Sequence, residues 1–131
     1  MNKKDKDWKT CLPEEVYKVL REKGTEPPFT GKYTENKKEG AYLCAGCGQE
    51  LFSSSSKFDS GTGWPSFASP LNKNKVELRL DDSHFMHRTE VVCSKCEGHL
   101  GHVFDDGPKP TGKRFCINSL ALKFKEKSVK S

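Results

Sequence analysis

Two Cys-x-x-Cys pairs constrain the fold of this chain more than any other feature of its sequence. Cys44 and Cys47 form the first pair, and Cys93 and Cys96 form the second. Two residues between cysteines let both thiolates bind one ion from a tight turn, and two such pairs supply the four sulfurs of a closed, tetrahedral zinc site. The 45 residues that separate the pairs exceed the roughly 15–20 of a zinc ribbon. The spacing therefore predicts a domain inserted between two metal-binding turns.

Two other uses of these cysteines are a pair of disulfides and a pair of redox-active dithiols. Disulfides are disfavoured in a cytoplasmic protein. A thioredoxin-like dithiol opens a helix within a βαβ unit, a pattern that neither pair shows. We therefore predict one structural zinc ion. Because all four ligands come from the protein, this ion leaves no coordination position open for a substrate.

The composition indicates a soluble, single-domain chain. Apolar residues make up 33% of its 131 residues and charged residues 31%, and no apolar run approaches the roughly 18 residues of a membrane span. The basic N-terminus lacks the apolar segment of a secretory signal. We therefore expect a cytoplasmic protein, unless a targeting peptide upstream of residue 1 has been removed. The net charge of +5 lies in residues 1–9 and 123–131, and the charges between these segments cancel.

This charge distribution predicts two flexible basic tails, residues 1–10 and 125–131, around a single domain that covers residues 11–124. A nucleic-acid-binding domain usually has a basic face on its folded body. We therefore expect neither a nucleic-acid nor a membrane partner, and we expect a monomer. The alternative is a zinc-containing binding module that uses its basic tails, and salt-dependent binding to nucleic acid would favour it.

A single helix is expected near the N-terminus. Pro13 marks its first turn, which also holds two glutamates, and Gly24 lies just past its end. One face of this helix is apolar and carries Val16, Val19 and Leu20.

Short strands dominate the chain after residue 40. They are expected over residues 75–80, 88–93 and 114–124, and the last of them is interrupted near Asn118. The apolar residues of the first strand share one face: Val76, Leu78 and Leu80. These patterns predict a mainly β, antiparallel fold with a small N-terminal helical segment.

Cys116 lies inside the last predicted strand, outside the two cysteine pairs. Arg114 and Asn118 are each two residues away and fall on the same face of the strand. A polar, cationic face favours the thiolate form of a cysteine, whereas a buried free cysteine often serves as a small apolar core residue. Strand periodicity alone does not decide between a catalytic and a buried thiol.

His99 and His102 follow closely after the second cysteine pair. The zinc ion already has four sulfur ligands, and a second metal ion would need ligands that the spacing does not obviously provide. An imidazole near a cysteine completes a nucleophile and a proton donor, whereas two surface histidines would contribute only polarity. Both interpretations stay open from these residues alone.

The segment 61–67, Gly-Thr-Gly-Trp-Pro-Ser-Phe, is a stiff loop. Its two glycines allow unusual backbone angles, and Pro65 restricts the chain. Trp64, with Phe67, is therefore a candidate for the apolar wall of a pocket. The alternative is that the indole is an ordinary part of the core.

Four motifs run in order through the second half of the chain: Gly63-Trp-Pro-Ser-Phe67, Gly98-His-Leu-Gly-His-Val-Phe104, Asp106-Gly-Pro108 and Arg114-Phe-Cys-Ile-Asn-Ser119. Together they resemble the B-type methionine sulfoxide reductases, enzymes that reduce the R epimer of methionine sulfoxide. The resemblance runs from about Pro13 to Phe124. It implies a fold of two antiparallel sheets with a small helical N-terminus.

The resemblance also implies a thiol-dependent reaction on methionine-R-sulfoxide, preferentially in oxidised proteins. The nucleophile would attack the substrate sulfur and end as a sulfenic acid, while a protonated imidazole supplies protons to the departing oxygen. The implied residues are the nucleophile Cys116; the polar pocket residues His99, His102, Arg114 and Asn118; Trp64 and Phe115 around the ε-methyl group; and the zinc ligands Cys44, Cys47, Cys93 and Cys96. The resemblance does not say which histidine donates the proton.

One residue departs from the family's pattern. Many members carry a cysteine between Gly61 and Gly63 that attacks the sulfenic acid to form a disulfide, and this chain has Thr62 there. A hydroxyl group cannot form that disulfide. Cys11 is the remaining cysteine, and it is either the resolving thiol or an idle one. If Cys11 is idle, thioredoxin, glutathione or a similar thiol must reduce the sulfenic acid directly.

Overall fold

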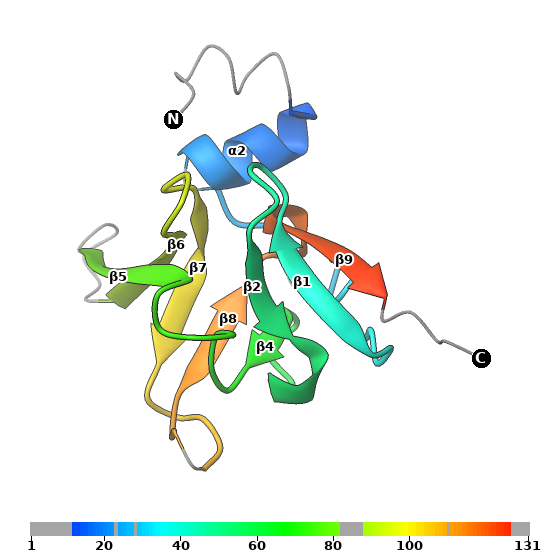
Figure 1. The fold of residues 1–131 in the computed structure, drawn as a ribbon, viewed down its shortest axis with the longest axis vertical. Helices are drawn as coiled ribbons and strands as arrows, with labels where there is room; N and C mark the ends of the chain where they lie inside the picture. The colour runs from blue at the N-terminus through cyan, green and yellow to red at the C-terminus, as the bar shows by residue number, and fades with distance from the viewer. Residues whose placement is uncertain (1–11, 23, 28, 82–87, 110, 127–131) are drawn as a thin grey trace.

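The computed structural model describes residues 12–22, 24–27, 29–81, 88–109 and 111–126 (Figure 1). Its elements in chain order are α2 (Glu14–Glu22), β1 (Gly40–Cys44), β2 (Glu50–Ser53), η1 (Ser54–Ser56), β3 (Lys57–Phe58), β4 (Ser66–Phe67), β5 (Val76–Asp81), β6 (Arg88–Cys93), β7 (His99–Phe104), β8 (Arg114–Ile117), η3 (Ser119–Ala121) and β9 (Leu122–Glu126). The strands form a three-stranded sheet, β2-β1-β9, and a six-stranded sheet, β3-β4-β8-β7-β6-β5. All strand pairs are antiparallel. The predicted mainly β fold with two antiparallel sheets and a small N-terminal helix is confirmed.

Helix α2 forms where the sequence predicts it and packs against β7 and η3 (Figure 1). Its buried residues are Val19 and Leu20, on the face that the apolar pattern indicates. The N–H of Gly24 donates to the carbonyl of Lys18 at 2.8 Å and closes the helix. No helix in the described ranges is long and apolar enough to span a membrane.

The predicted strand 114–124 is divided between the two sheets. β8 ends at Ile117, and η3 then carries the chain across to β9, which runs to Glu126. The main-chain and side-chain N–H groups of Asn118 both donate to the carbonyl of Leu100 on β7, each at 3.0 Å. The interruption expected near Asn118 is therefore the point where the chain crosses from one sheet to the other.

Aromatic side chains fill the space between the two sheets. Phe52 of β2 stacks on Phe67 of β4 with ring centroids 4.4 Å apart, and Tyr42 of β1 meets the same ring edge-on at 5.1 Å. Phe115 of β8 joins this cluster at 6.0 Å from Phe52. Because side chains alternate along a strand, burial of Phe115 and Ile117 turns the other face of β8 away from this core.

Strand β5 is an edge strand, and its apolar face is only partly buried. Val76 is 8% exposed, but Leu78 is 54% and Leu80 73% exposed. Among the described residues, Leu78 is thus only about half covered and Leu80 less than that. The alternating pattern identified the strand correctly, but the face that carries Val76, Leu78 and Leu80 is buried in the core only at Val76.

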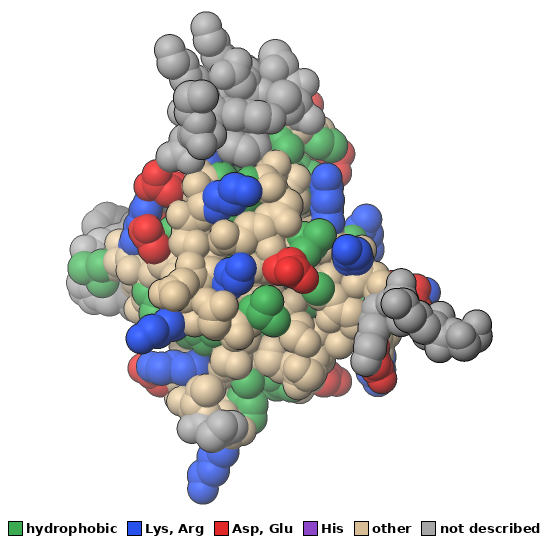
Figure 2. Space-filling model, viewed as in Figure 1, with side chains coloured by type: hydrophobic (Ala, Val, Ile, Leu, Met, Phe, Trp, Pro, Cys, Tyr) green, Lys and Arg blue, Asp and Glu red, His purple; other side chains and the backbone are tan. Residues whose placement is uncertain are grey.

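Charged side chains are mixed on the face shown in Figure 2. Lys and Arg side chains lie among Asp and Glu side chains there instead of forming one continuous basic patch. This mixture agrees with the cancelling charges of the central part of the sequence.

Candidate functional site

The sulfurs of the two cysteine pairs meet in one cluster. All four lie within 4.8 Å of one another, with 3.6 Å between Cys44 and Cys96 and 3.5 Å between Cys47 and Cys93. Zinc–sulfur bonds of about 2.3 Å in a tetrahedron hold sulfurs roughly 3.8 Å apart. These four cysteines form no disulfide. The cluster thus has the donor set and the dimensions of a four-sulfur metal site, and a structural zinc ion fits it.

Each cysteine pair lies in a turn that folds back on its own first cysteine. The N–H groups of Gly48 and Glu97 donate to the carbonyl of that cysteine, at 2.9 and 2.8 Å. Both residues are left-handed, with φ of 80° and 62°. In the second turn the left-handed residue is Glu97, and the glycine that follows it, Gly98, packs against α2. A Cβ at Gly98 would lie 3.1 Å from the Leu20 side chain, closer than ordinary van der Waals contact.

Hydrogen bonds inside the cluster distribute the protons unequally among the four sulfurs. Those from Cys44 lower the pKa of Cys47 and lower that of Cys93 to about 7, whereas the pKa values of Cys44 and Cys96 are raised. The side-chain amide of Gln49 lies 3.7 Å from the sulfur of Cys93 and donates to the Ser94 hydroxyl at 3.0 Å. Thiolate is the form of cysteine that binds a metal ion, and a bound cation would favour that form at all four sulfurs.

Cys116 lies in a separate cavity of about 250 Å³, on the face of β8 that points away from the core. In the pairing of β8 with β7, His102 lies directly opposite Cys116. On the other side of β8, Ser66 of β4 lies opposite the same cysteine. The residues that line the cavity are Thr25, Thr62, Trp64, Arg88, Gly101, His102, Phe104, Arg114, Cys116 and Asn118. Six of the residues predicted or singled out from sequence are therefore brought together: Thr62, Trp64, His102, Arg114, Cys116 and Asn118.

The surroundings of Cys116 act on the pKa of its thiol in opposite directions. Burial raises its pKa, while the Thr62 hydroxyl, 4.0 Å from the sulfur, and the Arg114 guanidinium lower it. Burial outweighs the other two, so the pKa of Cys116 lies above its ordinary value. A bound substrate that brings further donors to the sulfur would shift the balance towards thiolate.

Arg114 is fixed beside the cavity by two partners. Its Nε and Nη2 donate to the two carboxylate oxygens of Asp106 at 2.9 and 3.2 Å, and its guanidinium lies 4.5 Å from the centre of the Phe104 ring. The hydrogen bonds to Asp106 raise the pKa of Arg114. The guanidinium therefore stays cationic next to Cys116 and keeps one orientation.

The two histidines have different positions. His102 lines the cavity, and its Nε2 lies 2.8 Å from the carboxylate of Asp81. His99 is 3% exposed, does not line the cavity, and bonds through Nδ1 to the buried carboxylate of Glu90 at 2.7 Å. The two imidazole rings meet edge-on, with centroids 5.3 Å apart. His102 is therefore the imidazole that faces Cys116, and His99 supports it from behind.

Glu26 holds two walls of the cavity and was missed from the sequence. Its carbonyl accepts from the indole N–H of Trp64 at 2.9 Å, and its N–H donates to the side-chain oxygen of Asn118 at 3.1 Å. Its own carboxylate is buried and accepts from the N–H of Leu120 at 2.9 Å. Residues 26 and 118 are 92 positions apart, and no local pattern marks such a contact.

Phe115 is not part of the cavity, which corrects the expected apolar wall. It is 6% exposed and packs in the aromatic core. Neighbouring residues of a strand point to opposite faces, so Phe115 and Cys116 cannot line one pocket. Phe104 of β7 takes the place beside the cavity that we had expected Phe115 to occupy, with Trp64 as the second aromatic ring. Cys11 lies outside the described residues.

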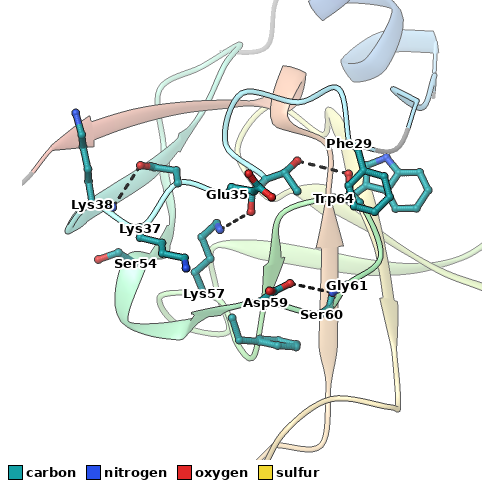
Figure 3. A pocket seen from close by; sticks show the side chains of 14 residues that line it. Phe29, Glu35, Lys37, Lys38, Ser54, Lys57, Asp59, Ser60, Gly61 and Trp64 are labelled. Carbon is teal, nitrogen blue, oxygen red and sulfur yellow. Dashed lines mark hydrogen bonds between the residues drawn. The ribbon is translucent and has the colours of Figure 1, made fainter.

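A second, larger hollow adjoins this cavity. It has a volume of about 620 Å³ and is bordered by the segment 34–38 on one side and by residues 57–61 on the other (Figure 3). Trp64 lines both hollows. The loop that holds Trp64 therefore separates the Cys116 cavity from an open groove.

Comparison with known proteins gives one family over nearly the whole chain. The model of the SelR domain matches residues 12–126. A peptide methionine sulfoxide reductase MsrB from Methanosarcina barkeri is 59% identical over 125 residues, which are 95% of this chain and 88% of that protein. A protein with the same name from Leptospira interrogans is 56% identical over 126 residues, which are 96% of this chain and 96% of that protein. Another from Hahella chejuensis is 55% identical over 124 residues, which are 95% of this chain and 89% of that protein.

Proposed function

Because the chain belongs to the SelR domain family, we propose that it reduces methionine-R-sulfoxide to methionine, with Cys116 as the nucleophile. The observation that carries this proposal is the direct pairing of Cys116 with His102 across β8 and β7, in one cavity with Arg114. The relatives named peptide methionine sulfoxide reductase, 55–59% identical over most of the chain, support the reaction class.

The first step is the attack of the Cys116 thiolate on the sulfoxide sulfur. The sulfoxide oxygen is a poor leaving group until it takes up protons. One thiol and one sulfoxide then give one sulfenic acid and one thioether, so the substrate sulfur is reduced and the sulfur of Cys116 is oxidised. The rings of Trp64 and Phe104 supply the apolar side of the cavity, which suits the ε-methyl group.

We assign the proton donor to His102. Its ring lines the same cavity as Cys116, and the contact of its Nε2 with the carboxylate of Asp81, at 2.8 Å, fixes the orientation of the ring. The Arg114 guanidinium adds positive charge where the oxygen carries a developing negative charge. His99 acts through His102 by holding the position of its ring.

The sulfenic acid must be reduced before a second turnover. One thiol attacks the sulfur of Cys116, releases water and forms a disulfide, and a second thiol then releases Cys116. We propose a dithiol such as thioredoxin, or another cellular thiol, as the final reductant, and oxidised proteins as the main substrates. Cys11 is the candidate for the first of these thiols, and direct attack by the external reductant is the other route.

Zinc has a structural role in this proposal. Cys44, Cys47, Cys93 and Cys96 would hold it, and when bound it supplies a cross-link between the β1–β2 and β6–β7 turns. It leaves no coordination position for the sulfoxide, so the chemistry belongs to the Cys116 cavity alone.

The test is to incubate the protein with the separate R and S epimers of N-acetylmethionine sulfoxide and dithiothreitol, and to measure methionine. We expect reduction of the R epimer alone. Cys116→Ser should reduce neither epimer while its circular dichroism and zinc content match the wild type. Turnover by a folded Cys116→Ser protein would exclude Cys116 as the nucleophile.

A further inference from the structure

The groove beside the catalytic cavity has no role in the reaction proposed above. The catalytic cavity, about 250 Å³, is smaller than the roughly 300–1,000 Å³ of a typical small-molecule site and has room for little more than one side chain. Whatever is attached to a bound methionine sulfoxide must therefore lie outside it. The groove of about 620 Å³ begins at Trp64, on the other side of the loop 61–64.

Phe29 stands at the end of this groove next to Trp64 (Figure 3). Its side chain is 70% exposed, and its backbone is left-handed, with φ of 65°. The N–H of Phe29 donates to the carbonyl of Gly63 at 2.7 Å, which ties it to the loop that carries Trp64. A bulky residue with positive φ is strained, and burial of this ring does not offset the strain in the free protein. The exposed ring of Phe29, next to the indole of Trp64, forms the apolar end of the groove.

The charged residues that line the rest of the groove sum to +1. Lys37, Lys38 and Lys57 line it together with two acidic residues, Glu35 and Asp59. Among the described residues none of these lysines forms an ion pair, and Lys57 donates to the carbonyl of Thr34 at 2.8 Å. The carboxylate of Asp59 accepts from the N–H of Gly61 at 3.0 Å, so part of the negative charge is used inside the loop. The balance at the groove surface is positive.

We propose that this groove binds the polypeptide on one side of a protein-bound methionine sulfoxide, with an apolar side chain against Phe29 and acidic side chains against Lys37 and Lys38. This inference rests on the proposed function, because it is the methionine sulfoxide in the catalytic cavity that places its neighbours in the groove. The two hollows share Trp64 in their lining, and this adjacency supports the proposal. The chain therefore prefers sulfoxides in extended acidic segments over sulfoxides flanked by basic residues.

The test compares three substrates. The first, N-acetylmethionine-R-sulfoxide, does not reach the groove. The other two are octapeptides with methionine sulfoxide and Phe at their centre, and the residues around this pair are Glu in one peptide and Lys in the other. For the Glu peptide we expect the double variant Lys37→Glu/Lys38→Glu to raise KM roughly tenfold, and Phe29→Ala to raise it several-fold for both peptides. All variants should reduce the small substrate at the wild-type rate. The matched control, Lys73→Glu/Lys123→Glu, reverses two exposed lysines outside the groove and should change none of these values.

Binding of the corresponding methionine peptides, measured by fluorescence anisotropy, tests the groove without turnover. We expect tighter binding of the Glu peptide than of the Lys peptide, and loss of this difference in Lys37→Glu/Lys38→Glu. If wild type and the double variant discriminate equally between the peptides, the groove proposal is wrong even when the small substrate is reduced. Failure of the wild type to reduce the small substrate would instead refute the proposed function, and the anisotropy result would still decide the role of the groove.

Discussion

Replacing Thr62 with cysteine should give this protein an internal resolving thiol. The hydroxyl of Thr62 already lies 4.0 Å from the sulfur of Cys116. A disulfide needs a sulfur–sulfur distance of about 2.05 Å. The flanking Gly61 and Gly63 have φ of 72° and 94°, and glycine allows the loop to make this small adjustment at low cost. After one turnover the introduced thiol should attack the sulfenic sulfur, form the disulfide and release water.

The size of the effect follows from the distance along the chain. Positions 62 and 116 are 54 residues apart. Closing a loop of this length removes enough conformational entropy from the unfolded chain to stabilise the folded state by about 4 kcal/mol. For a domain of this size that corresponds to a rise in Tm of roughly 10–20 °C. The oxidised Thr62→Cys protein should therefore melt far above the same protein reduced with dithiothreitol.

The assay uses proteins that also carry Cys11→Ser, so that this thiol cannot react. Each is incubated with excess methionine-R-sulfoxide without reductant, and free thiols, intact mass and Tm are then measured. Thr62→Cys should lose two thiols relative to the untreated protein. The control, Thr62→Ser, should lose one thiol and keep its Tm. Loss of one thiol with an unchanged Tm in Thr62→Cys would refute the placement of the loop 61–63 against Cys116.

Three other perturbations test separate parts of the structure. Cys96→Ser should lose the metal and lower Tm by roughly 10 °C or more, and an unchanged zinc content by atomic absorption would contradict the four-sulfur site. Burial raises the pKa of Cys116, so the rate at which iodoacetamide alkylates this thiol should still rise with pH above pH 9. Arg114→Met removes a nearby cation and should move this pH profile to still higher pH. A shift of the profile to lower pH would contradict the placement of Arg114 beside the thiol. Glu26→Ala removes the buried acceptor of a main-chain N–H and should lower the free energy of unfolding by about 1–3 kcal/mol and raise KM. Glu26→Gln keeps an acceptor oxygen and should have a smaller effect on both. Equal melting temperatures for Glu26→Ala and the wild type would argue against this role of Glu26.

Local patterns in the sequence were sufficient for the metal centre and for one side of the cavity. The two cysteine pairs could be recognised from local sequence, because the two-residue spacing within each pair already predicts a turn that brings both sulfurs to one ion. Strand alternation was likewise enough to place Arg114, Cys116 and Asn118 on one face, and all three line the cavity. These are short-range relations, which a sequence expresses directly.

Relations between distant segments could not be predicted in the same way. His99 and His102 were equivalent candidates, and only the register of β7 against β8 sets His102 opposite Cys116. Phe115 was assigned to the pocket by resemblance, against the alternation of its own strand. Glu26 had no pattern at all, since its contacts come from the packing of the segment after α2 against η3.

The described contacts connect the four-cysteine cluster to the Cys116 cavity. The guanidinium of Arg21 on α2 donates to the carbonyl of Cys96 in the second cysteine turn at 2.8 Å. The chain that leaves α2 reaches Glu26 within four residues of the helix end, and Glu26 bonds to both Trp64 and Asn118. The C-terminal end of the helix is therefore fixed to the second cysteine turn, and the segment that follows it positions two walls of the cavity. We therefore expect the four-cysteine cluster to affect turnover through the end of α2, because this segment sets where the pocket walls lie relative to Cys116, the proposed nucleophile on β8.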